Sequence, residues 1–193
     1  MKRVIMVGAA VIAVATSGLA FSDDGNGKFR EVLSGLKEAP QIVLTTGSGT
    51  FEATISKDGS EIDYVLTFEN LKSDARQAHI HLGWPQSNGN VVLWLCDSDG
   101  PGLPASPVAS TPLCSQNSAP GDIKSGRVEG TLTAADLVAV PANGIAGSAD
   151  FGNVVAAIRS GLTYVNVHTA NIAAGEIRSQ LSRGDEQGHQ HNH

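Results

Sequence analysis

Six histidines in this 193-residue chain fall into two groups, and the spacing of the first suits metal binding. His79 and His81 lie two residues apart in a segment that alternates polar and apolar residues, and His168 ends a second segment of this kind. Side chains two residues apart on a strand point to the same face, so His79 and His81 project together, away from Ile80. If the strand of His168 lies close by, the three imidazoles can share one copper or zinc ion and leave one coordination position open.

Two charged residues follow on the next expected strand and could support this site. Glu176 and Arg178 share a face there, from which they could hydrogen-bond to His168 and orient its ring toward the metal. The alternative is that the pair forms a structural ion pair or anchors the backbone. Metal ligation needs neutral imidazole, so binding should weaken as the pH falls through about 6.5, the ordinary pKa of histidine.

The second histidine group lies in the polar segment 182–193. His189, His191 and His193 alternate with other residues, a pattern that chelates divalent metals loosely in a flexible chain. We expect a disordered tail here, which either collects metal or is simply a solvated end.

Other chemistries find little support in the sequence. There is no Gly-x-Ser-x-Gly nucleophile motif and no glycine-rich phosphate loop between a strand and a helix. The 13 Lys and Arg against 19 Asp and Glu give a net charge of −6, which leaves no basic stripe for nucleic acid. Three interpretations stay open: a non-catalytic module that binds a divalent metal, a structural module that binds a protein or envelope partner without metal, and a copper-dependent enzyme like superoxide dismutase. The sequence supports the enzyme least, because it has too few strand histidines for the full set of dismutase ligands and no evident loop for a bridging ligand.

The first twenty residues have the features of a secretory signal. Lys2 and Arg3 precede an apolar run over 4–14, and Gly18-Leu19-Ala20 offers a small-residue cleavage site. The alternative is a membrane anchor, but the apolar run is shorter than the ~20 residues that a spanning helix needs. We therefore expect export to the periplasm or the extracellular space, with no membrane span after cleavage and a flexible lead over 21–28.

Export changes the interpretation of the two cysteines. Cys96 and Cys114 are the only pair, and they bracket a segment rich in proline and glycine. In an oxidising compartment the default for such a pair is a disulfide. A disulfide that closes a ring of this size stabilises the fold by roughly 3 kcal/mol, because it lowers the conformational entropy of the unfolded chain.

The elements that must position the histidines are mostly strands. Alternation with a period of two predicts strands near 51–56, 62–68, 78–82, 91–95, 127–132, 164–168 and 176–181. Asp58-Gly59 predicts a hairpin between the first two, and the short connection 169–174 predicts another between 163–168 and 175–181. Trp94 is expected in the core. The fold class is therefore all-β: an antiparallel, Greek-key-like β-sandwich of about seven to eight strands.

Helices are minor in this prediction. A helix is expected over 150–160, ended by Gly161, and a capped turn at 133–136. Segment 29–36 is ambiguous, because Phe29, Val32, Leu33 and Leu36 have helical spacing while Gly35 breaks the run.

Several motifs in order along the chain resemble the CHRD (chordin) domain family. They are an opening with Leu33-Ser34-Gly35, Glu38, Pro40 and Gly49-Thr50-Phe51, and then the segments 78–83, 130–136, 161–169 and 175–178. The resemblance covers 29–181, with Gln41 and Ser179 departing from the usual pattern. It implies an extracytoplasmic β-sandwich, found in chordin as repeated modules near growth-factor binding regions and in bacteria as single secreted domains. It also favours a strand over 29–36 and implies no established activity for the bacterial members.

Overall fold

The computed structural model describes residues 27–98, 104–119 and 122–181. The predicted signal segment, most of the lead and the tail with His189, His191 and His193 lie outside these residues. The elements are β1 (Lys28–Ser34), β2 (Ser48–Ile55), β3 (Glu61–Glu69), β4 (Ala75–Leu82), β5 (Asn90–Cys96), β6 (Gly126–Thr133), α1 (Phe151–Arg159), β7 (Thr163–Thr169) and β8 (Ile177–Gln180), with 3-10 turns at Gly35–Lys37, Ala134–Asp136, Pro141–Asn143 and Ser148–Asp150.

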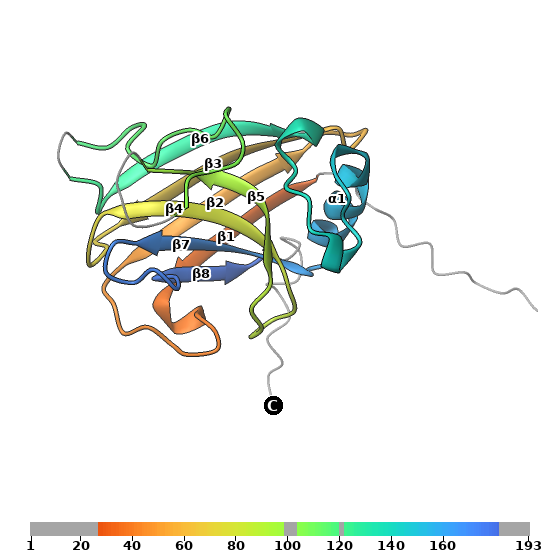
Figure 1. Cartoon of the computed structure of the whole chain (residues 1–193). Helices are drawn as coiled ribbons and strands as arrows, with labels where there is room; N and C mark the ends of the chain where they lie inside the picture. The colour runs from red at the N-terminus through yellow and green to blue at the C-terminus, as the bar shows by residue number, and fades with distance from the viewer. Residues whose placement is uncertain (1–26, 99–103, 120–121, 182–193) are drawn as a thin grey trace, which may run out of the picture.

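The eight strands form one antiparallel sheet in the order β5-β4-β7-β8-β1-β2-β3-β6. Figure 1 shows how strongly this sheet curves, so that its first and last strands approach each other. β5 and β6 are in contact, and the Tyr64 hydroxyl on β3 donates to the Leu95 carbonyl on β5 at 2.6 Å. The predicted all-β, sandwich-like class is confirmed, and its two layers belong to a single sheet that folds over itself.

Alternation in the sequence sets which side of each strand enters the core. On β2 and β3, residues such as Phe51, Ile62 and Leu66 are fully buried, while their chain neighbours point outward. Ile80 on β4 and Val167 on β7 join the same core. Apolar burial on one face of every strand thus holds the sheet in its curved form.

The ambiguous segment 29–36 is a strand over most of its length. Phe29 and Leu33 are buried, whereas Val32 and Leu36 are 56% and 67% exposed. The helical spacing was therefore misleading: pairing of β1 with β2 along its whole length imposes a period of two on this segment.

The other local predictions hold with small differences. β7 and β8 form the predicted hairpin, and α1 lies within the predicted helix, with Gly161 at a φ of 71° behind it. Thr133 and Asp136 form the capping box. At the β2–β3 connection, Gly59 has a φ of 72° and thereby supplies the left-handed position of this hairpin.

The predicted disulfide between Cys96 and Cys114 is present. It ties the end of β5 to the long connection that leads to β6. Within the described residues, no helix is long and apolar enough to cross a membrane.

Candidate metal centre

The three strand histidines come together on the face of the sheet opposite the core. His79 and His81 lie on β4 and His168 on β7, and the two strands are hydrogen-bonded neighbours. The register places His168 opposite Gln77, so that His168 and His79 are diagonal neighbours. The ring centroids of His79 and His168 are 4.9 Å apart, and those of His81 and His168 are 5.8 Å apart. One ring nitrogen from each residue lies within 4.8 Å of the other two.

Backbone carbonyls orient two of the three rings. Nδ1 of His81 lies 3.0 Å from the Gly89 carbonyl oxygen, and Nδ1 of His168 lies 2.9 Å from that of Ala173. A carbonyl only accepts, so each Nδ1 carries the proton and donates, and each Nε2 keeps its lone pair. Both Nε2 atoms, and both ring nitrogens of His79, are buried without a hydrogen-bond partner among the described residues.

The histidines face away from the core, yet they are not exposed to solvent. His79, His81 and His168 retain 3%, 8% and 9% of their accessible surface. Trp94 on β5 packs edge-on against His79, with 4.2 Å between ring centroids, and Tyr164 on β7 stacks on His81 at 4.7 Å. Trp94 is thus buried, as predicted, but against the histidine cluster. Two aromatic rings therefore help to exclude solvent from the candidate metal centre.

This enclosure holds the imidazoles in their neutral form. Burial lowers the pKa of all three histidines, and it lowers that of His81 to about 4. The charges that His168 and His81 would carry lower the pKa of His79 further. The expected loss of metal near pH 6.5 therefore moves to lower pH, because desolvation penalises the imidazolium form.

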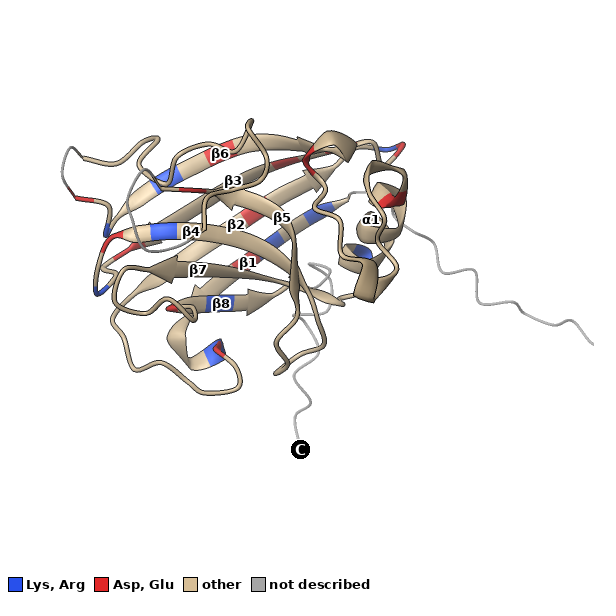
Figure 2. Cartoon of the chain, viewed as in Figure 1, with Lys and Arg blue, Asp and Glu red and all other residues tan. Residues whose placement is uncertain are grey.

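The donor set fits a small divalent ion. Zn–N bonds are about 2.0–2.1 Å, so three nitrogens on one tetrahedral ion are roughly 3.3 Å apart. Ligand nitrogens up to 4.8 Å apart reach that separation if small rotations of the rings move each nitrogen by about an ångström. Of the strands that carry or flank the cluster, β5 and β7 have no charged side chain and β4 has only Arg76 (Figure 2). The next strand, β8, carries Arg178, whose positive charge also lowers the pKa of His81.

Glu176 has a different role from the one expected. Its carboxylate accepts from the Thr45 hydroxyl at 2.6 Å, the Lys72 N–H at 2.8 Å and the Thr169 hydroxyl at 2.8 Å. None of these bonds involves His168, whose Nδ1 is held by Ala173 instead. Glu176 is a backbone and loop anchor, which is the alternative that the sequence left open.

Arg178 also acts one step away from the histidines. Its guanidinium lies 3.5 Å above the Tyr164 ring and donates to the Ser87 carbonyl at 2.8 Å. Because Tyr164 stacks on His81, Arg178 supports the cluster through this aromatic ring.

Sequence reasoning missed the residues that enclose the histidines. Tyr164 and Asn166 alternate with Val165 and Val167, so the period of two places them on the face of His168. Glu38 lies behind Asn166, and its Oε2 accepts from the Asn166 amide at 3.4 Å. No periodic pattern predicts this contact, because a turn far from β7 in the chain brings Glu38 there.

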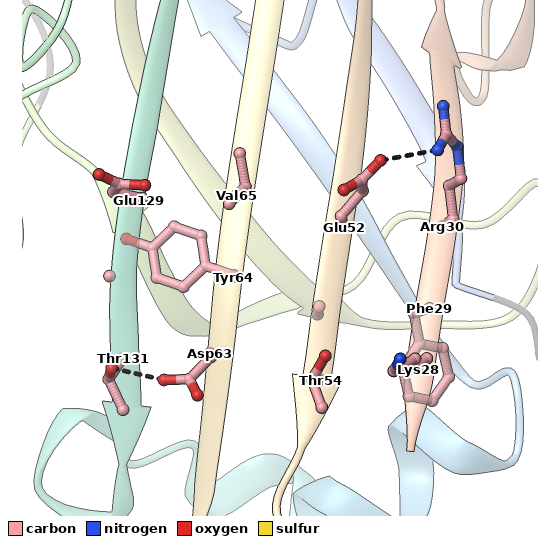
Figure 3. Close-up of a pocket in the computed structure, with 12 residues that line it drawn as sticks. Lys28, Phe29, Arg30, Glu52, Thr54, Asp63, Tyr64, Val65, Glu129 and Thr131 are labelled. Carbon is pink, nitrogen blue, oxygen red and sulfur yellow. Dashed lines mark hydrogen bonds and ion pairs between the residues drawn. The ribbon is translucent and has the colours of Figure 1, made fainter. Parts of the chain in front are cut away.

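A depression lies elsewhere, on the outer face of β1, β2, β3 and β6 (Figure 3). Several of its polar groups pair with each other: Arg30 with Glu52 at 3.0 Å, and Thr131 with Asp63 at 2.6 Å. In contrast to the histidine cluster, none of its described lining residues has a buried side-chain nitrogen or oxygen without a hydrogen-bond partner.

Comparison with known proteins identifies the domain. The family model described as CHRD domain matches residues 29–181, nearly all of the described chain. Neither the curated proteins nor the solved structures contain a significant match.

Proposed function

The chain belongs to the CHRD domain family over residues 29–181, and from this premise we propose that it is a non-catalytic binding module that holds one divalent metal ion on His79, His81 and His168. Copper(II) is the first choice and zinc(II) the second, since imidazole suits both ions and copper binds nitrogen donors more strongly. When bound, the metal supplies a cationic Lewis acid with one position left for water or another donor.

The preorganised nitrogens are the observation that carries this proposal. Four ring nitrogens are buried without partners, and the two imidazoles with a hydrogen bond spend Nδ1 on a backbone carbonyl. Buried polar atoms without partners are costly, and native proteins rarely keep several together without a use. An ion bound to one nitrogen of each histidine would satisfy three of these four atoms at once, with the carbonyls setting the orientation of the His81 and His168 rings as in known metal sites.

Enclosure favours retention of the metal over turnover. Trp94, Tyr164 and the 83–89 loop cover the cluster, and none of the three histidines is more than 9% exposed. A superoxide dismutase-like enzyme needs an accessible redox metal. Storage or delivery of the ion fits the enclosed geometry better.

The test is metal content in a background that lacks the three tail histidines. In full-length protein with His189→Ala, His191→Ala and His193→Ala, we expect one copper or zinc ion per chain after loading and desalting, measured by elemental mass spectrometry. Adding His79→Ala should abolish this uptake, whereas Leu44→Ala, at an exposed side chain outside the site, should not change it. Less than stoichiometric uptake in the tail variant would leave the metal-free binding module as the function.

Export to the periplasm or the extracellular space belongs to the same proposal. It is supported by the basic and apolar start of the chain and is compatible with the Cys96–Cys114 disulfide. N-terminal sequencing of exported protein should begin at Phe21. Retention of Met1 in a membrane fraction would instead indicate an anchor.

A further inference from the structure

A cavity of about 670 Å³ lies two strands away from His81, between β8, the start of the chain segment after β1 and the turn at Pro85. Figure 1 shows the segment after β1, in orange, extending past β8. The polar residues Glu38, Arg178 and Gln180 line this cavity, together with the apolar residues Leu36, Ile42 and Pro85. The volume is typical of small-ligand sites.

The cavity exists because the sheet is splayed at this point. β1 and β8 share only one residue pair, Ser34 with Arg178. Next to this pair, side chains connect β1 and β8 in place of backbone hydrogen bonds. Lys37 donates to the Ser179 hydroxyl at 3.0 Å, and Ser179 donates to Glu31 at 3.1 Å. The opening is therefore part of the fold.

Three buried polar atoms of the lining residues lack a partner among the described residues. They are Oε1 of Glu38, Nη1 of Arg178 and Oε1 of Gln180. Glu38 and Arg178 are 7% and 1% exposed. The Gln180 amide nitrogen donates to the carbonyls of Gly83 and Gly161, which leaves its oxygen as an acceptor. Apart from the histidine cluster, this is the largest group of unsatisfied buried atoms in the described chain.

The required ligand has both donors and an acceptor. Glu38 and Arg178 attract each other electrostatically, but no hydrogen bond or ion pair among the described residues joins them. Arg178 therefore needs an acceptor, whereas Gln180, and Glu38 in its ionised form, need donors. A ligand carboxylate could accept from Arg178, but it would face the oxygens of Glu38 and Gln180. A ligand ammonium group would instead face the guanidinium of Arg178. A carboxamide meets all three needs with one C=O and one NH₂ group.

We propose that this cavity binds a carboxamide side chain, Asn or Gln, presented by a peptide segment of a partner protein. The aliphatic groups of Leu36, Ile42 and Pro85 would contact the apolar neighbours of that side chain. Exposed Ile42 and Leu36, at 60% and 67%, extend this apolar surface outside the cavity. The lining residues within the described chain include no aromatic ring, which disfavours a sugar, since sugars stack on such rings.

The test is NMR titration of the full-length protein with blocked tripeptides at pH 8, above the raised pKa of about 7 of Glu38, so that its carboxylate is mostly ionised. Acetyl-Leu-Gln-Leu-methylamide should shift the side-chain signals of Gln180 and Arg178 and bind at least tenfold more tightly than the otherwise identical peptides with Glu or Met in the centre. That factor corresponds to one hydrogen bond to a buried group. Propionamide and methyl glucoside are the probes for a free amide and for a sugar.

Glu38→Gln is the matched variant, and Glu52→Gln, at a half-exposed residue on β2, is its control. Asn166 donates to Oε2 of Glu38, so in the variant the new amide oxygen would take that place and the new NH₂ group would face the ligand NH₂. We expect the preference for the Gln peptide to disappear in this variant and to persist in the control. If Glu38→Gln does not fold, Ile42→Glu at the exposed rim should weaken binding of the Gln peptide at least fivefold.

Equal affinity for the three peptides, or no shifts at roughly 10 mM, enough to saturate even a millimolar site, would overturn the proposal. So would binding of propionamide or methyl glucoside without binding of the Gln peptide. Metal content is a separate measurement, so failure here leaves the metal proposal standing, and the reverse also holds.

Discussion

At the scale of single residues, the candidate metal centre depends on desolvated neutral imidazoles. His79 is the extreme case, because both of its nitrogens are buried without a partner in the described chain and it lies between Trp94 and His168. Such a residue lowers the free energy of unfolding of the metal-free protein, and binding of an ion offsets this loss of stability.

Removal of one ligand should lower metal affinity sharply. In the background without tail histidines, His168→Ala leaves two nitrogens for the ion, and we expect affinity for copper or zinc to fall roughly 100-fold or more. Competition with a chromogenic chelator measures the change. Unaltered affinity would show that the ion binds elsewhere.

Glu176 should matter for stability and not for metal. Glu176→Gln replaces one of two oxygens that together accept three hydrogen bonds, so we expect a loss of about 1–3 kcal/mol in the free energy of unfolding. Metal affinity should stay within about threefold, because Ala173 holds His168. A large loss of affinity with unchanged stability would restore the role first expected for Glu176.

Acid should destabilise the metal-free protein through the buried histidines. Their folded pKa values lie below the ordinary 6.5, so below that pH the unfolded chain binds more protons, and stability falls as the pH drops toward the folded values. Each pKa unit is worth about 1.4 kcal/mol. Denaturation midpoints at pH 7 and pH 5 should therefore fall with acid.

Glu38 acts in the opposite direction and must be removed for this measurement. Burial raises its pKa from 4.5 to about 7, so its contribution to stability is complete below pH 4.5 and is lost as the pH rises through 7. The Glu38→Gln variant isolates the histidines. Stability in that variant that is constant or higher at pH 5 would contradict the neutral, desolvated imidazoles.

At the scale of elements, the 83–89 loop connects the histidine cluster to the rest of the molecule. Gly89 donates its N–H to the Tyr164 hydroxyl at 3.0 Å and accepts from His81. The Ser87 carbonyl accepts from Arg178, and that of Gly83 accepts from Gln180. The loop is thus fixed by the side chains that it covers.

Gly89→Ala should therefore disturb the metal site without touching a ligand. A Cβ at this position would lie 1.7 Å from the Leu82 carbonyl oxygen, so the loop must shift and release His81. We expect about a tenfold loss of metal affinity together with lower stability. Gly152→Ala in α1 is the control: its Cβ meets nothing within 4 Å, so it should add up to about 1 kcal/mol of stability and leave metal binding unchanged. Equal metal affinity in both variants would separate the loop from the site.

At the scale of the whole molecule, a few polar contacts close the curved sheet. The Tyr64 hydroxyl bonds to the Leu95 carbonyl, and the Val138 N–H bonds to the Val92 carbonyl at 3.0 Å. These contacts join β5 to β3 and to the segment after β6, where no strand ladder does so in the described residues.

Loss of the Tyr64 hydroxyl should loosen this closure. Tyr64→Phe leaves the buried Leu95 carbonyl without its donor, and we expect the free energy of unfolding to fall by about 1–3 kcal/mol. Thermal and denaturant unfolding measure the effect, and metal affinity should not change. Stability equal to that of the parent protein would show that apolar burial alone closes the sheet.

The sequence by itself determined the strands, the disulfide and the shared face of His79 and His81. The strands and the shared face follow from local rules, namely a period of two and residues two apart on one strand. The disulfide follows from the chain having only one pair of cysteines. Where local rules conflicted, as in the segment with Val32 and Leu36, pairing with β2 decided the outcome.

Only the tertiary structure decided what surrounds the histidines. Adjacency of β4 and β7 brings His168 to His79, the 83–89 loop supplies the Gly89 carbonyl, and a turn after β1 places Glu38 beside Asn166. Burial, and with it the lowered pKa values, follows from these long-range contacts. No local pattern encodes them, because desolvation of a side chain is set by every element packed around it.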